Sequence, residues 1–193
     1  MTKSTQKKKT DDLVIERVFD APVEQVWRAW TEPEHVKRWW GPKDFTAPEV
    51  HIDFQEGGKY LFCMRSEMGP EQWKEGIWST GTYLKIVPME KIVSTDSFSD
   101  EEGNIVPGTH YGMDDGFPLE LKVTVMFEEL KDNSPGSGAG KTKFTLRHEG
   151  FPKTEIDLAR QGWNESLDKL ADILNREKEI AERHSISAEK FQK

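Results

Sequence analysis

Two short helices, each with a start signal and a stop signal, are encoded in residues 17–42, RVFDAPVEQVWRAWTEPEHVKRWWGP. Asp20 belongs to the residue types that cap a helix, and Pro22 stands in the first turn, where its missing N–H has no cost. The apolar side chains that follow recur at i, i+3, i+4 and i+7, which predicts one buried helix face made of Val23, Val26, Trp27 and Trp30.

The second helix of this stretch has a capping-box pattern at its start. Thr31 is followed three residues later by Glu34, with Pro33 in the first turn. The run WWGP at residues 39–42 predicts the end of the helix, because Gly and Pro cannot readily continue it.

Alternation of apolar and polar residues predicts strands on both sides of this helical pair. A first strand is expected over residues 14–19, and six more near residues 50–54, 60–64, 76–86, 91–99, 119–129 and 142–149. The connections between successive strands are mostly short, with residues 67–71 as a hairpin connection. The sequence therefore predicts an antiparallel sheet of about seven strands.

A long helix is predicted near the C-terminus, over residues 154–174, which would span roughly 30 Å. Its apolar stripe consists of Ile156, Ala159, Trp163, Ser166, Leu167, Leu170 and Leu174. Beyond residue 175 the stripe thins. We expect one domain over residues 13–175, a disordered basic arm over 1–12, and a helix end with a frayed tail over 176–193.

Composition excludes several classes of function. The formal charge of −8 argues against a nucleic-acid partner, and no apolar run approaches the roughly 18 residues of a membrane span. The single cysteine, Cys63, has no partner for an intrachain disulfide and is expected to be a structural thiol. With no signal peptide at the start, a cytoplasmic location is expected.

No motif for a cofactor, metal or nucleophile is complete. A near match to a phosphate loop at residues 136–142 fails because Pro135 stands where its first glycine should be, and a strand pattern follows it. No G-x-S-x-G elbow is present, so no catalytic residue is predicted. The histidines lack ligand spacing and are expected to be solvated or capping: His35, His51, His110, His148 and His184.

Two connections are longer than a hairpin needs. Residues 100–118 carry several apolar side chains, and the sequence leaves open whether they form a lid or a poorly ordered insertion. His110 shares this loop with Asp114 and could serve as a polar anchor or an acid/base group. Residues 132–141 are rich in Gly and Ser and are expected to be a flexible hairpin tip.

Eight short motifs carry a family resemblance. They are FDAP at 19–22, VWRAWT at 26–31, PEH at 33–35, RWWGP at 38–42, GG at 57–58, GTY at 81–83, VTVMF at 123–127 and GWNESLDKL at 162–170. In these motifs the chain resembles the family named after the activator of heat-shock-protein-90 ATPase, a branch of the START-like or Bet v 1-like (SRPBCC) superfamily.

The resemblance implies an α+β helix-grip fold. In such a fold a curved antiparallel sheet wraps a long C-terminal helix, two short helices follow the first strand, and a cavity lies between sheet and helix. The same side chains can also pack as core, and both interpretations stay open. The expected ligand-binding residues are Trp39, Trp40, Phe45, Phe54, Tyr60, Phe62, Met64, Trp78, His110, Met113, Trp163, Ser166, Leu167 and Leu170.

The favoured function is binding of a small, mainly apolar ligand without its transformation. Ser166, His110 and Tyr60 would orient the ligand, and the loop 100–118 would act as a gate. Two alternatives follow from the resemblance: a cochaperone-like modulator of a heat-shock ATPase, and a cyclase-like or hydrolase-like enzyme that uses His110 and Asp114. A homodimer is compatible with the high aromatic content.

Overall fold

Seven strands form one antiparallel sheet in this computed structural model, which describes residues 10–131 and 140–190. The strand order across the sheet is β1-β7-β6-β5-β4-β3-β2, and the predicted sheet is thereby confirmed. The strands are β1 (Thr10–Phe19), β2 (Thr46–Ile52), β3 (Lys59–Arg65), β4 (Ile77–Val87), β5 (Lys91–Ser99), β6 (Leu121–Leu130) and β7 (Lys141–Pro152).

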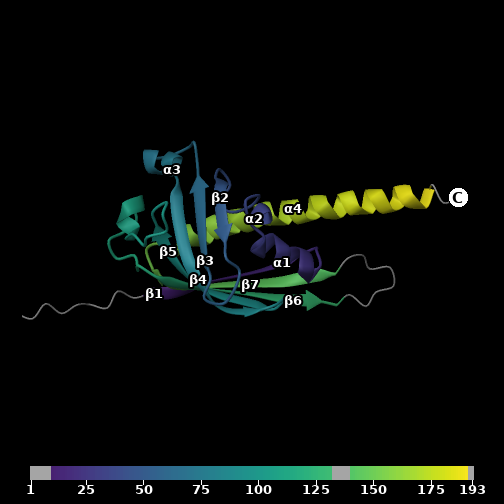
Figure 1. Cartoon of the computed structure of the whole chain (residues 1–193), viewed down its shortest axis with the longest axis horizontal. Helices are drawn as coiled ribbons and strands as arrows, with labels where there is room; N and C mark the ends of the chain where they lie inside the picture. Colours follow the sequence, from purple (N-terminus) through teal and green to yellow (C-terminus); the bar gives the residue numbers. More distant parts are fainter. Residues whose placement is uncertain (1–9, 132–139, 191–193) are drawn as a thin grey trace, which may run out of the picture.

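One long helix lies across this curved sheet (Figure 1). It is α4 (Ile156–Lys190), and the short helices α1 (Val23–Thr31) and α2 (Pro33–Val36) lie beside it after the first strand. Two further helical turns, α3 (Glu71–Glu75) and the 3-10 turn η1 (Gly108–Tyr111), lie in connections. This arrangement confirms the α+β helix-grip fold.

The core lies between the sheet and α4, and the strand alternation selects its side chains. In β7, Phe144 and Leu146 are buried without exposed surface, whereas Thr145 between them is partly exposed. Leu167 and Leu170 of α4 are likewise fully buried. Burial of each such side chain contributes about 2 kcal/mol to stability.

The helix starts differ from the predicted caps. Asp20 pairs with Lys178 of α4 at 2.6 Å, and Pro22 is the residue before α1, where no side chain caps the helix. The capping box was also wrong, because the Thr31 hydroxyl donates to the carbonyl of Trp27 at 2.9 Å within α1. Residue Glu32 precedes α2 instead.

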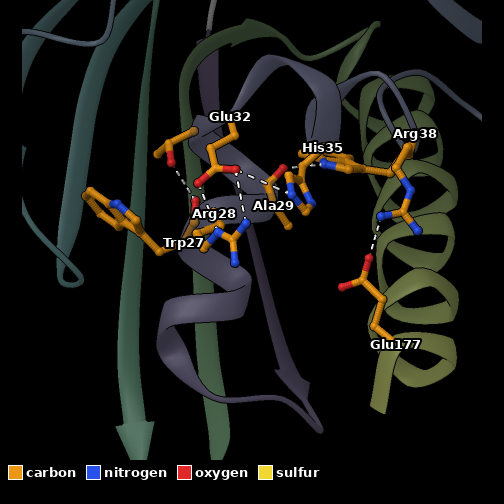
Figure 2. Close-up of polar contacts among 9 residues, drawn as sticks. Trp27, Arg28, Ala29, Glu32, His35, Arg38 and Glu177 are labelled. Atoms are coloured by element: carbon orange, nitrogen blue, oxygen red, sulfur yellow. Dashed lines mark hydrogen bonds and ion pairs between the residues drawn. The ribbon is translucent and has the colours of Figure 1, made fainter. Parts of the chain in front are cut away.

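The corner between α1 and α2 is tied together by Glu32. Figure 2 shows its carboxylate between Arg28 and His35. The carboxylate lies 2.9 Å from Nε of Arg28 and 3.4 Å from Nε2 of His35. In the same view Arg38 points to Glu177 of α4, with which it forms an ion pair. The two short helices are therefore fixed to each other and to the long one.

Both chain ends differ from the expected boundaries. β1 begins at Thr10, so residues 10–12 belong to the sheet, whereas residues 1–9 of the predicted arm lie outside the described residues. The expected hairpin tip falls mostly on residues 132–139, also outside them. α4 continues past Leu174 to Lys190, and its residues 181–184 are exposed. No helix in the described ranges combines the length and the apolar character needed to cross a membrane.

Lys169 joins α4 to the turn that follows α2. Its Nζ donates to the carbonyl oxygens of Gly41 at 2.8 Å and Phe45 at 2.9 Å, and lies 3.4 and 3.3 Å from those of Trp40 and Pro42. Burial lowers the pKa of Lys169. The hydrogen bonds between the ammonium group and these carbonyl groups replace those that each would otherwise make with water.

The change Lys169→Met should lower the free energy of unfolding by about 2 kcal/mol, because it leaves several carbonyl oxygens without a donor. Denaturant unfolding measures the effect. The matched control is Lys178→Met, which removes only the ion pair with Asp20 and should cost less than about 1 kcal/mol. Equal losses in the two variants would contradict this role of Lys169.

Cys63 is fully buried in β3, directly opposite Trp78 of β4. Burial raises the pKa of its thiol from 9.0 to about 11. A thiol in this state is a poor nucleophile at neutral pH. The geometry agrees with the structural role expected from the sequence.

At pH 8, iodoacetamide should therefore modify Cys63 slowly in the folded protein and rapidly in denaturant, as intact mass would record. Between pH 9 and 11 the folded thiol keeps a proton that the unfolded thiol loses. The free energy of unfolding should consequently fall as the pH rises through this window, with a smaller slope in Cys63→Ala. Fast alkylation of the folded protein would refute the assignment.

Candidate functional site

A small cavity lies between the helices and the concave face of the sheet. Its volume is about 40 Å³. The helices and the turn after them contribute Trp30, Val36, Trp39, Trp40 and Trp163. The strands contribute Tyr60, Phe62, Tyr83, Ile92, Ser94, Asp96, Val123 and Val125.

The size of the cavity limits what it holds in this conformation. The volume suits about three water molecules or one compact organic group, whereas pockets for larger ligands occupy about 300 Å³ or more. Most of the surrounding aromatic side chains therefore pack as core. Trp30 lies parallel to Trp163, with ring centroids 6.1 Å apart, and Trp40 meets Trp163 edge to face at 5.4 Å.

Among the described residues that line the cavity, Asp96 supplies the one charged side chain. The Tyr60 hydroxyl donates to its Oδ1 at 2.7 Å and lies 3.1 Å from the carbonyl oxygen of Thr95. Burial, and then the neighbouring Asp96 charge, raise the pKa of Tyr60 well above its usual value. Tyr60 is therefore a neutral hydrogen-bond donor to the carboxylate.

His148 lies next to Asp96, behind the cavity wall. It is 3% exposed, and its Nε2 lies 3.2 Å from Oδ2 of Asp96 without a well-aligned hydrogen bond. The indole Nε1 of Trp163 donates to Nδ1 of His148 at 3.2 Å. Tyr60, Asp96, His148 and Trp163 thus connect β3, β5, β7 and α4, and we refer to these four residues as the polar chain.

Strand register brings these side chains to one face. Ser94 lies opposite Val123, and Val123 lies opposite His148, so the three share a face on adjacent strands. Tyr60 lies opposite Gly81, where a Cβ atom would stand 2.7 Å from the Tyr60 hydroxyl oxygen and 2.0 Å from the Thr95 carbonyl oxygen. The Tyr60 ring occupies its place because residue 81 has no side chain.

Five of the expected ligand-binding residues line the cavity: Trp39, Trp40, Tyr60, Phe62 and Trp163. Trp39 is also held by its indole N–H, which donates to the carbonyl of Ala29 at 2.8 Å. Sequence reasoning correctly grouped these aromatic side chains on facing elements. Whether they bind a ligand stays a prediction.

Four other expected residues do not line the cavity. Phe54 contacts Trp27 and Tyr83, while Phe45 contacts Trp73. Met64 is half-buried beside Gly41. Trp78 is paired with Cys63 and so lies on the opposite sheet face from Tyr60 and Phe62.

The expected helix residues Ser166, Leu167 and Leu170 are buried but do not line the cavity. The Ser166 hydroxyl donates to the carbonyl of Gly162 at 2.8 Å, one turn earlier in α4. Its hydrogen is therefore used within the helix. Leu167 and Leu170 pack in the core.

The loop of residues 100–118 packs at the end of the sheet. Tyr111 is 5% exposed, and its hydroxyl donates to the Ser99 carbonyl at 2.6 Å and accepts from the Trp78 N–H at 3.2 Å. His110 is exposed and Met113 half-buried. Within the described residues, none from this loop lines the cavity.

Asp96 and His148 were missed by sequence reasoning, and the expectation that His148 is solvated or capping was wrong. The alternation along β7 did indicate that His148 faces the core, because His148 falls in the same period-two series as Thr142, Phe144 and Leu146. All four are buried. Polar residues at such positions resemble solvent-facing ones unless their partners on other strands are known.

No cluster of three or more His, Cys, Asp or Glu side chains suited to a metal occurs in the part of the chain that the structure describes.

A curved antiparallel sheet that grips a long helix, with an aromatic cavity between them, defines a helix-grip protein. The chain belongs to the family described as Activator of Hsp90 ATPase homolog 1-like protein, whose model matches residues 20–175. The family resemblance noted from the motifs is thereby confirmed. No curated protein matches the chain.

Solved structures of bacterial proteins share this fold. A Chromobacterium violaceum protein is 25% identical, with a TM-score of 0.63 over 84% of this chain and 96% of that one. An Arthrobacter aurescens protein is 24% identical, with a TM-score of 0.64 over 87% and 91%. The AHSA1 protein of Silicibacter pomeroyi is 21% identical, with a TM-score of 0.62 over 86% and 99%.

The change Tyr60→Phe should lower the free energy of unfolding by about 1–2 kcal/mol, because it removes the hydrogen bond to the Asp96 carboxylate. Thermal or denaturant unfolding measures the loss. Tyr83→Phe is the matched control, since Tyr83 also lines the cavity but its hydroxyl has no side-chain bond among the described residues. A Tyr83→Phe loss as large as that of Tyr60→Phe would disprove the special role of the Asp96 contact.

Proposed function

We propose that this protein binds a small, mainly apolar molecule in the cavity between the sheet and α4 and does not transform it. The observation that carries the proposal is the combination of seven aromatic side chains with one carboxylate around a single cavity. Aromatic walls with a few polar groups are the usual composition of a small-molecule site.

The packing around the cavity supports a site with a movable wall. Trp40 and Trp163 are half-buried and contact each other, whereas Trp39 is 1% exposed and hydrogen-bonded. Ligands larger than the present cavity would require Trp40 or Trp163 to shift. Small ligands would enter without such a change.

The polar groups of the site favour orientation over catalysis. Ser94 and Asp96 lie on the same side of β5 and face the aromatic side chains of the helices. Tyr60 and His148 flank the Asp96 carboxylate and hold it in position. His110, the acid/base candidate from the sequence, is exposed on the distant loop.

Native mass spectrometry of freshly purified protein should record a reproducible mass above that of the chain, which disappears on unfolding. Titration with small aromatic probes such as indole and naphthalene should change the intrinsic tryptophan fluorescence, because four tryptophans line the cavity. Ser94→Met should weaken binding at least about tenfold by filling the space.

The control is Val93→Met, the same side chain on the opposite face of β5, which should leave the affinity unchanged. A clean chain mass together with constant fluorescence across the probes would refute the proposal. Equal effects of Ser94→Met and Val93→Met would place binding elsewhere.

The family description favours one second candidate, modulation of a heat-shock ATPase. Its test is the rate of ATP hydrolysis by the purified chaperone with saturating amounts of this protein. An unchanged rate would remove this candidate.

A further inference from the structure

Within the proposed function, on which this inference rests, we propose that the cavity selects an organic cation, such as a methylated ammonium group, and that Asp96 is its counter-ion. The proposal comes from the charge balance of the polar chain and from the aromatic walls around it. It names the chemical class of the ligand.

The protonation state of His148 follows from its partner. An indole N–H can only donate, so Nδ1 of His148 must accept the bond from Trp163 and carries no proton. The single proton of the ring then lies on Nε2, which is 3.2 Å from Asp96 Oδ2. His148 is neutral in this arrangement and leaves the charge of Asp96 uncompensated.

The other neighbours of Asp96 do not supply a positive charge. Tyr60 donates a neutral hydroxyl to Oδ1. None of the described residues that line the cavity is Lys or Arg. Lys169 touches the backbone of Trp40, but its ammonium group is bound to carbonyl oxygens outside the lining.

The aromatic walls add to the same preference. The faces of Trp, Tyr and Phe rings carry partial negative charge and attract cations. Four of the lining residues are Trp, the best of these side chains for this contact. A carboxylate and several indoles around one small space therefore match a cation better than a neutral group of the same shape.

The volume is also suitable for such a group. The space of about 40 Å³ holds one compact head group but no extended molecule. A methylated ammonium is compact and less strongly hydrated than a primary ammonium, so its desolvation costs less, and Asp96 would supply the opposite charge. A hydroxyl or ether of equal size carries no charge and would leave Asp96 without a counter-ion.

The test compares two molecules of nearly identical shape, choline and 3,3-dimethylbutan-1-ol, in which a quaternary carbon replaces the charged nitrogen. Tryptophan fluorescence should give a dissociation constant for choline at least tenfold lower than that for the alcohol. In Asp96→Asn the choline affinity should fall about tenfold and the alcohol affinity should stay the same.

The variant is designed to keep the fold. An asparagine at position 96 can accept from His148 and donate to Tyr60, whose hydroxyl can turn to the Thr95 carbonyl 3.1 Å away. Asp115→Asn is the matched control, because it makes the same change of charge on an exposed loop residue and should leave both affinities unchanged.

A second measurement does not depend on any variant. The ¹⁵N chemical shifts of the His148 ring should report a neutral ring with its proton on Nε2. A doubly protonated His148 at neutral pH would overturn the inference, because the ring would then compensate Asp96.

The outcomes separate this inference from the proposed function. Equal affinities for choline and the alcohol, or choline binding that is unaffected by Asp96→Asn, would overturn cation selection and leave ligand binding intact. Binding of neither molecule would also overturn it, and native mass spectrometry would then decide the proposed function independently.

Discussion

The contact between Lys169 and the turn after α2 is the constraint around which the helical layer is built. One ammonium group holds carbonyl oxygens from Trp40 to Phe45, and this turn carries Trp39 and Trp40 into the core. The turn needs Gly41, whose φ of 89° is unfavourable for other residues and whose missing Cβ leaves room for Phe45. Because the anchor belongs to α4, the turn that carries Trp40 is tied directly to the helix that closes the cavity.

Unlike the Lys169 contact, the polar chain lowers stability relative to an apolar core. Placing a carboxylate and a neutral imidazole among aromatic side chains costs solvation energy that an apolar core would not lose. The network recovers part of this cost through the Tyr60 and Trp163 hydrogen bonds, yet Nε2 of His148 keeps no well-aligned partner. Such a compromise is common where a binding site is set into a core, because the groups that recognise a ligand are left incompletely satisfied without it.

Most of the fold could be predicted from the sequence, because the strands alternate clearly and the apolar stripe of α4 has helical spacing. Helix starts were less predictable: Thr31 fits a capping box in sequence but bonds back to Trp27, and Asp20 pairs with a lysine far along the chain. The helix α3 has five residues and only one apolar side chain, Trp73, so it shows no helical period of apolar residues. At the site, the aromatic walls were predictable from residue type, whereas Asp96 and His148 depend on register across β5, β6 and β7, which local patterns do not contain.

The length of α4 has a mechanical consequence. Trp163 lies near its beginning, against the cavity and His148, and the helix then runs on to Lys190. This distance is roughly 40 Å along a stiff rod. A tilt of about 5° at the tryptophan would displace the far end by about 3.5 Å, so a small change in helix direction at the cavity is enlarged at the end of α4.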